Sequence, residues 1–264
     1  MKKGITKKLG TVALVMSLSI SSLMASNVVS DTVKLIDIAG KQRMLSQRIA
    51  KDYLYAGKNV AKSKATKELK ASLKELNTAH KRLVDSINDP EIQNLLSFVQ
   101  MSGEDFESTA KKAFDLDNAQ LVIDLSESML EGSQYVVNSL KKKIKVKVKE
   151  STIVGIAGRQ RMLAQRIAKY YIAYQAGIKD KNTVDQMKAA VKLFADAHKK
   201  LMSNQANTPE INRRLNDIDR MWKIVYKFYL NIEKGGLPLI VFNTTNDITK
   251  RMNKITNLYV ELYK

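Results

Sequence analysis

The chain of 264 residues contains no cysteine, only two histidines and only three prolines. Without cysteine, disulfide bonds, thiol catalysis and cysteine-based metal sites are excluded. The two histidines, His80 and His198, lie far apart in the sequence, so a histidine-based metal site or catalytic triad is not expected. No repeated pair of carboxylates and no nucleophile with a base stands out. We therefore predict that the protein is not an enzyme and holds no metal ion and no cofactor.

Aromatic residues are scarce, at 6%, whereas 45 Lys and Arg against 26 Asp and Glu give a formal net charge of +19. Such a charge favours encounters with small anions, acidic proteins or anionic lipid surfaces. The few aromatic residues and the export signal described next argue against nucleic acid as the partner. The composition thus indicates an anionic partner without identifying it.

Long hydrophobic runs are absent except near the N-terminus. Four lysines within residues 2–8 precede an uncharged run over residues 9–26 that ends in small residues. A basic region, an apolar region and a small residue before a cleavage point are typical of a secretory signal peptide. We expect residues 1–25 to be removed and the protein to be periplasmic. The alternative is an uncleaved N-terminal helix that anchors the protein in the inner membrane.

One segment of thirteen residues occurs twice. Residues 39–51 read AGKQRMLSQRIAK and residues 157–169 read AGRQRMLAQRIAK, so the copies differ at only two positions. The rest of the two units differs much more, as helices do when only their apolar pattern matters. We predict a tandem duplication with units at residues 26–148 and 149–264. The repeated segment is the candidate for function.

Apolar residues recur at helical spacing along both units. Pro90 and Pro209 each follow a capping side chain and stand where a helix begins. Gly57 and Gly177 occupy matching positions at which a left-handed residue ends a helix. Four helices per unit with short connections predict an all-α fold of two tandem antiparallel four-helix bundles. The expected helices are residues 30–57, 62–88, 90–113, 117–148, 150–177, 181–205, 209–234 and 237–263.

The joint between the units has no glycine or proline from Ser133 to Thr152. Lysines alternate with β-branched residues over 141–149, a pattern that could also form a short strand. We expect one continuous helix over residues 117–177, about 90 Å long. Its lysines are interpreted as a solvated face, with an anionic lipid or acidic protein contact as the alternative. A straight helix would separate the repeated segments and require a homodimer to pair them, whereas a sharp bend would pair them within one chain.

A seam of small and polar residues runs along the repeated segment at the four-and-three spacing of helix contacts. Where two such helices meet, two guanidinium groups would face each other, which is unfavourable unless an anion lies between them. A planar oxyanion such as nitrate fits the parallel donors of a guanidinium group. The candidate ligand-binding residues are Gly40, Arg43, Gln47, Gly158, Arg161 and Gln165, with Arg48 and Arg166 as secondary candidates on another face. The alternative is that Arg43 and Arg161 form salt bridges that fix the bundle geometry.

The pattern Ala-Gly-x-Gln-Arg-Met-Leu-x-Gln-Arg resembles the first-helix signature of the PilJ/NarX-like sensor domain, found in type IV pilus chemotaxis transducers and nitrate/nitrite-sensing histidine kinases. The resemblance covers nearly all of the chain after residue 25, twice. It implies four-helix bundles that hold a ligand between paired first helices by the first arginine of the pattern, here Arg43 and Arg161. The pattern is closer to the pilus-transducer version than to the nitrate-sensor version.

The resemblance implies a family whose members usually continue through a second membrane helix into a signalling module, and we expect neither in this protein. We therefore expect a sensor-type protein that binds a small anion such as nitrate or nitrite and passes the bound state to a membrane chemoreceptor or histidine kinase. The alternative is a structural or interaction protein that docks on a membrane receptor or a pilus or chemotaxis assembly without a small ligand.

Overall fold

The computed structural model describes the backbone of residues 9–143 and 148–263 and the side chains of residues 33–142 and 152–263. Within these ranges every regular element is helical, which confirms the predicted all-α fold of tandem helical bundles. The elements are α1 (Leu9–Gly57), α2 (Lys62–Ser86), α3 (Pro90–Ala110), α4 (Leu116–Lys143), α5 (Val148–Ala176), α6 (Lys181–Met202), α7 (Pro209–Leu230), the short 3₁₀ helix η1 (Ile232–Lys234) and α8 (Pro238–Leu262).

The beginnings of α3 and α7 follow directly from local side-chain chemistry. The Asp89 carboxylate accepts a hydrogen bond of 3.1 Å from the backbone N–H of Ile92, and the Thr208 hydroxyl accepts one of 3.3 Å from Ile211. Each satisfies a backbone donor that the first turn leaves without a partner. The predicted starts are confirmed. The predicted C-terminal ends of α2, α3, α6 and α7 were two to four residues too late, because the chain already turns toward the next helix there.

The two glycines at matching helix ends differ in their role. Gly177 follows α5 with a φ of 115°, as predicted for a residue that ends a helix outside the usual region. Gly57 is instead the last residue of α1, and the residues with positive φ in that turn are Asn59 and Ala61. Gly57 is constrained by packing, because the Phe114 side chain occupies the space where a Cβ would be.

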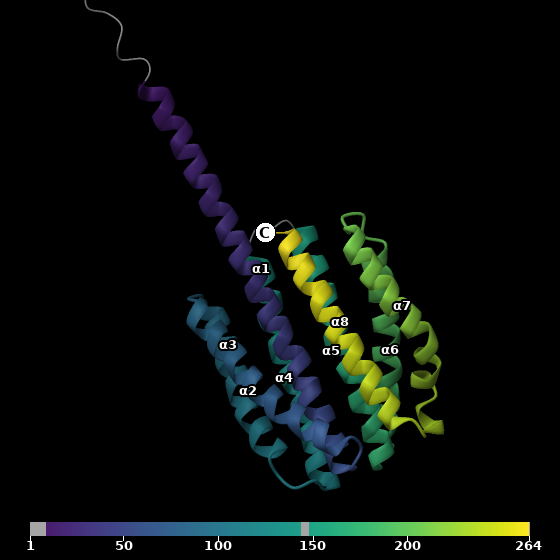
Figure 1. The fold of residues 1–264 in the computed structure, drawn as a ribbon. Coiled ribbons are helices and arrows are strands. Elements are labelled where there is room, and N and C mark those ends of the chain that lie inside the picture. Colours follow the sequence, from purple (N-terminus) through teal and green to yellow (C-terminus); the bar gives the residue numbers. More distant parts are fainter. Residues whose placement is uncertain (1–8, 144–147, 264) are drawn as a thin grey trace, which may run out of the picture.

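The two helices that carry the repeated segment lie at the centre of the molecule. α1 packs against α2, α4 and α5, and α5 packs against α1, α6 and α8. The pair α2 and α3 covers one side of this central layer, and α6 and α7 cover the other (Figure 1). Side chains between Ala39 and Tyr55 are therefore buried on almost every face of α1, and those between Ala157 and Ala173 are buried on α5.

The expected continuous helix over residues 117–177 is wrong. α4 ends at Lys143, α5 begins at Val148, and α5 returns along α1 (Figure 1). Residues 144–147 of the lysine-rich joint lie outside the part of the chain that the structure describes. Packing the small-residue faces of the two central helices together buries more surface than end-to-end units could, and this outweighs local helix continuity. The two repeated segments therefore pair within one chain, and the homodimer that a straight helix required is not needed.

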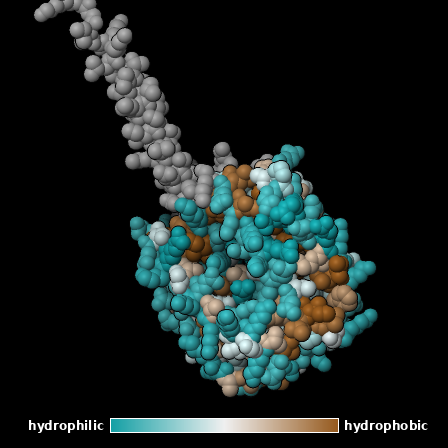
Figure 2. Space-filling model, viewed as in Figure 1, coloured by the Kyte–Doolittle hydropathy of each residue, from teal (hydrophilic) through white to brown (hydrophobic). Residues whose placement is uncertain are grey.

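The surface in the view of Figure 2 is mostly hydrophilic, in line with the high content of lysine and arginine. Apolar side chains gather over the lower part of α7 and the beginning of α8, where Ile224, Phe228, Leu239 and Ile240 are each at least half exposed. Among the helices of the described part of the chain, none combines the length and apolar character needed to cross a membrane.

Candidate functional site

Arg43 of α1 and Arg161 of α5 meet between the two central helices, and their exposed fractions are only 3% and 1%. A Cβ on Gly40 would lie 3.1 Å from Nη2 of Arg43 and 4.0 Å from Nη2 of Arg161, so both guanidinium groups reach the same place beside this glycine. Gly158 has the same relation to Arg161, at 3.2 Å. The structure thus brings together four of the six predicted ligand-binding residues. We call this group the arginine seam.

The two arginines of the seam have unequal partners. Arg161 donates from Nη2 to Oδ1 of Asp37 at 2.6 Å and from Nη1 to Oδ1 of Asn253 at 2.8 Å. Arg43 donates from Nη1 to the neutral Gln134 side chain, and no carboxylate of the described residues lies within ion-pair distance of it. Both Nε atoms are buried without a hydrogen-bond partner there. Within the described residues, Arg161 thus has a carboxylate partner and Arg43 does not.

The unequal partners follow from one position in the duplication. With Gly40 matched to Gly158, the second-copy residue that corresponds to Asp37 is Gly155, so Arg43 has no counterpart of the aspartate that Arg161 has. A Cβ on Gly155 would lie only 2.5 Å from Nζ of Lys141, so a lysine reaches the position where a carboxylate would balance the charge.

The electrostatics at this end of the seam are strongly positive. Burial, reinforced by the nearby Arg159 and Arg161, lowers the pKa of Arg43 to about 9. Burial and the charges of Arg43 and Arg159 lower the pKa of Lys141 as well. Lys141, predicted to lie on a solvated face, is instead partly buried against the seam. Among the side chains that the structure describes, the positive groups here outnumber the acid Asp37, and such a place favours a bound anion.

Gln47 and Gln165, the other two predicted ligand residues, hold the fourth helix of their own unit. The Gln47 amide donates to the backbone oxygen of Ser126 in α4 at 2.9 Å. The Gln165 amide donates to Oγ1 of Thr249 in α8 at 2.6 Å and also faces Asn246 Oδ1 at 3.2 Å. These contacts fix the position of the central helices one turn beyond the arginines.

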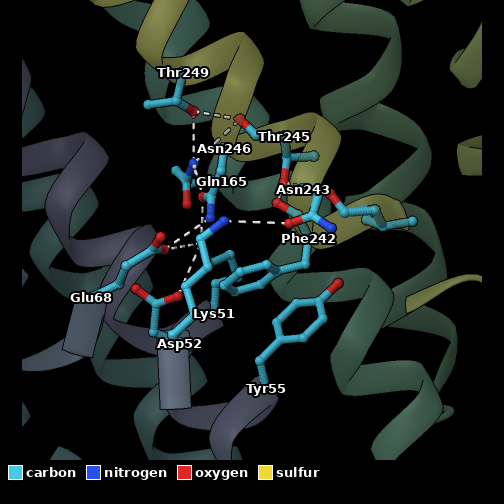
Figure 3. A network of polar contacts seen from close by, with 12 residues as sticks. Lys51, Asp52, Tyr55, Glu68, Gln165, Phe242, Asn243, Thr245, Asn246 and Thr249 are labelled. Atoms are coloured by element: carbon cyan, nitrogen blue, oxygen red, sulfur yellow. Dashed lines mark hydrogen bonds and ion pairs between the residues drawn. The ribbon is translucent and has the colours of Figure 1, made fainter. Parts of the chain in front are cut away.

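A second polar layer, which the sequence reasoning missed, surrounds Lys51. This fully buried lysine points from α1 toward the Asp52 carboxylate at 2.9 Å, the Glu68 carboxylate of α2 at 3.4 Å and the Asn246 amide oxygen of α8 at 2.7 Å (Figure 3). Its ammonium group also lies 4.5 Å from the centre of the Phe242 ring. The sequence contained one indication of this layer: the repeated segment ends in lysine in both copies, at Lys51 and Lys169.

The second copy repeats this layer with different partners. Lys169 of α5 is fully buried, donates to the Ser126 hydroxyl of α4 at 2.9 Å and pairs with the Glu127 carboxylate. Arg166 pairs with the same carboxylate at 2.6 Å. The lysine that ends each repeated segment thus binds the fourth helix of the other unit, since Lys51 reaches α8 and Lys169 reaches α4. These contacts join the two bundles.

The buried Asp52 carboxyl makes stability depend on pH. Burial raises its pKa from 3.8 to about 7, although Lys51 opposes the shift. The folded state therefore holds this proton more tightly than the unfolded state, and ionisation between about pH 4 and 7 lowers the free energy of unfolding. Asp52→Asn removes this loss. We expect the unfolding free energy of the variant, minus that of the wild type, to increase by more than about 1 kcal/mol from pH 4.5 to 8.

Denaturant unfolding at several pH values measures this difference. Asp85→Asn is the control, because it makes the same change at an exposed carboxylate that pairs with Lys81. A difference for Asp52→Asn that stays constant across this pH range, or that Asp85→Asn reproduces, would contradict the assignment.

Arg48 and Arg166 lie away from the arginine seam, as their place on the helix predicted. Arg48 lines a pocket between α1, α2 and α8, and Arg166 lines a corresponding pocket between α4, α5 and α6. Within the described residues no group of three or more His, Asp or Glu side chains is arranged to hold a metal ion.

Comparison with known families agrees with this arrangement. The model of the PilJ family, described as the N-terminal domain of type IV pili methyl-accepting chemotaxis transducers, matches residues 25–112 and 145–234, together more than half of the chain. Searches of curated proteins and of solved structures found no match. Domains of this family are non-enzymatic sensor domains, typically periplasmic, that work with methyl-accepting chemoreceptors. The chain, which carries two tandem copies of the domain around a paired arginine seam, therefore belongs to the PilJ family.

Proposed function

We propose that the protein is a sensor-type ligand-binding protein that holds a small anion, such as nitrate or nitrite, at the arginine seam. The observation that carries the proposal is the asymmetry of the seam: Arg161 has Asp37 as its counter-ion, whereas the similarly buried Arg43 has none among the residues that the structure describes. A buried guanidinium group without a counter-ion is unfavourable. A planar anion beside Gly155 would take the place of the missing carboxylate, with Arg43 and Lys141 as its cationic partners.

The seam is well placed to pass a bound state onward. The Asp37–Arg161 pair and the proposed anion both act between α1 and α5. An anion would change the relative free energies of the arrangements of these two helices, which is the requirement for a ligand-driven switch. A shift of α1 against α5 would be carried to the N-terminal end of α1 that remains after residues 1–25 are removed. The partner proposed to read it is a membrane chemoreceptor or histidine kinase.

Thermal unfolding with a panel of anions at constant ionic strength tests this function. Because a ligand that binds only the folded state stabilises it by mass action, nitrate or nitrite at 100 times its Kd should add about 2.7 kcal/mol. Chloride and sulfate should add less. We expect the selective effect to disappear in Arg43→Gln and in the double variant with Arg161→Gln. Arg220→Gln, on the exposed surface, should leave it unchanged.

A charge-installing variant sharpens the test. Gly155→Asp places a carboxylate beside Lys141 and Arg43, where the first copy has Asp37 at the corresponding position. We expect it to abolish the response to anions, because the site then contains its own counter-ion. Gly155→Asn is the matched control, since it adds a side chain of the same size at the same place without the charge and should keep more of the response. Equal responses of both variants, or no selective anion effect in the wild type, would exclude an anion site here.

The second candidate is a protein that docks on a membrane receptor or a pilus or chemotaxis assembly without a small ligand. The Asp37–Arg161 ion pair and the Asn253 hydrogen bond favour it, because they give both terminal nitrogens of the Arg161 guanidinium group partners from within the chain. In that case the arginine variants lower the unfolding temperature and no anion has a selective effect.

The location and the units of the chain also enter the proposal. We propose that residues 1–25 direct export, that residues 26–148 and 149–264 form the two sensor units, and that the protein acts in the periplasm. The family's typical location supports this. The lysines of the leading segment lie outside the residues that the structure describes.

A further inference from the structure

A pocket of about 510 Å³ opens between α1, α2 and α8, outside the arginine seam. Its walls include Arg48 from α1, Lys64 from α2 and Lys250 from α8, together with the side chains of Asn243 and Asn253. Sites for small organic ligands usually measure about 300 to 1,000 Å³. The pocket is therefore large enough for an organic molecule.

Three of the four basic side chains that line this pocket lack a counter-ion among the described residues; the fourth, Lys41, pairs with Glu75. Among the described residues no carboxylate lies within ion-pair distance of Arg48, Lys64 or Lys250, and Nε of Arg48 is buried without a hydrogen-bond partner. The three acids that line the pocket have partners other than Arg48, Lys64 and Lys250. Glu75 pairs with Lys41 and Glu68 faces Asn246, both within the pocket lining, and Glu68 also faces the buried Lys51. Asp247 pairs with Arg251 at 2.8 Å.

The duplicated unit supplies a comparison for this pocket. The corresponding pocket between α4, α5 and α6 has about 340 Å³, and there Arg166 donates to the Glu127 carboxylate at 2.6 Å. The matching glutamines align α4 with α8: Gln47 donates to the backbone oxygen of Ser126, and Gln165 faces the backbone oxygen of Thr245. Ser126 therefore corresponds to Thr245. By the same alignment, Glu127 corresponds to position 246 and Glu131 corresponds to position 250. In α8 the residues at these two positions are Asn246 and Lys250, so neither is acidic.

These two replacements convert one wall of the pocket from acidic to neutral and basic. In the smaller pocket the protein itself provides the carboxylate that Arg166 binds. In the larger pocket the matching Arg48 faces space that a carboxylate could fill. Because a guanidinium group binds a carboxylate through parallel donors, the ligand that this position fits is a carboxylic acid.

We propose that the pocket between α1, α2 and α8 binds a small di- or tricarboxylic acid. One carboxylate of the ligand is held by Arg48, as Glu127 is held by Arg166 in the second copy. A second carboxylate of the ligand lies in the part of the pocket lined by Lys64 and Lys250. The side-chain amides of Asn243 and Asn253 can donate hydrogen bonds to the ligand. Such a ligand bridges α1 and α2 of the first unit and α8 of the second, so it stabilises the contact between the two bundles.

Titration calorimetry on the full chain tests the proposal, with succinate, citrate and inorganic phosphate as probes. We expect saturable binding of succinate or citrate, with phosphate weaker. Arg48→Gln should weaken it by about 10- to 100-fold, the usual effect of losing a charged hydrogen-bond pair. Lys250→Glu, which restores the acidic residue of the second pocket, should weaken binding by at least about tenfold. Lys254→Glu makes the same change at an exposed residue of α8 outside the pocket and should have little effect.

Binding of a carboxylic acid in this pocket can be tested independently of anion binding at the arginine seam. Arg43→Gln should leave binding of the carboxylic acid intact, and Arg48→Gln should leave any response to nitrate intact. Lys250 is exposed, so its variant reports on binding even if Arg48→Gln impairs folding. Absence of saturable binding of succinate and citrate, phosphate binding tighter than both, or equal binding in the Lys250→Glu and Lys254→Glu variants would overturn the proposal, whatever the seam does.

Discussion

Asp37→Asn is expected to lower the free energy of unfolding by about 3 kcal/mol, at the lower end of the range for breaking a buried ion pair. Its partner Arg161 is 1% exposed, and the Asp37 side chain itself is only 20% exposed. Asparagine keeps the shape and one oxygen acceptor but removes the negative charge. The two buried guanidinium groups would then face each other without the Asp37 carboxylate beside them. Denaturant unfolding at neutral pH measures the change.

Asp217→Asn provides a closely matched control. The Asp217 side chain is 24% exposed, almost the same as that of Asp37, but its partner Arg220 is 76% exposed. Water screens that pair, so its removal should lower the free energy of unfolding by about 0.5 kcal/mol or less. Equal losses in the two variants would show that burial of the arginine partner does not govern the energetics of the seam.

The Asp37→Asn variant also tests ligand binding at the arginine seam. Asp37 is the acid that offsets the positive charge of the arginine seam, so its removal leaves more unbalanced charge for an anion to neutralise. We expect nitrate to stabilise Asp37→Asn more than it stabilises the wild type. If the seam is only a structural ion pair, the variant loses stability and no particular anion restores it.

Gly57→Ala is expected to lower the free energy of unfolding by about 2 kcal/mol, within the range for inserting one carbon into a filled space. The new Cβ would lie 2.8 Å from Cβ of Phe114, with two ring atoms closer still. A rotation of the ring cannot relieve the contact with Phe114 Cβ, because the backbone fixes that atom. The contact joins the end of α1 to the turn before α4, so the backbone there has to move. Thermal or denaturant unfolding reports the loss.

Two comparisons isolate this steric cause. Gly177→Ala, in the turn after the corresponding helix α5, meets only Leu116 at 3.9 Å but has a φ of 115°, so we expect a smaller loss of about 1 kcal/mol from backbone strain. In a Phe114→Ala background most of the penalty of Gly57→Ala should disappear, which a double-mutant cycle measures. A penalty that persists in that background would mean that Gly57 is needed for its backbone conformation after all.

Much of the helical framework could be read from the sequence because the signals are local. The apolar period and the capping residues before Pro90 and Pro209 depend on neighbours within a few positions, and the helices formed there. The family was also recognisable, because the repeated segment is distinctive and occurs twice. The meeting of two arginines was an inference from the helical wheel, and the structure places Arg43 and Arg161 beside Gly40.

The sequence by itself determined the helices, the duplication and the family, because periodicity, capping and repetition are properties of nearby residues. Only the tertiary structure decided that the units pair within one chain, because the packing of α1 on α5 is a long-range contact that overrides the unbroken helical pattern of the joint. It also decided which buried charges are balanced. Asp37 neutralises Arg161, Lys51 and Lys169 bind the opposite unit, and Arg43 and Arg48 have no carboxylate within ion-pair distance among the described residues. These contacts join residues far apart in sequence, and no local pattern records which pairs will meet.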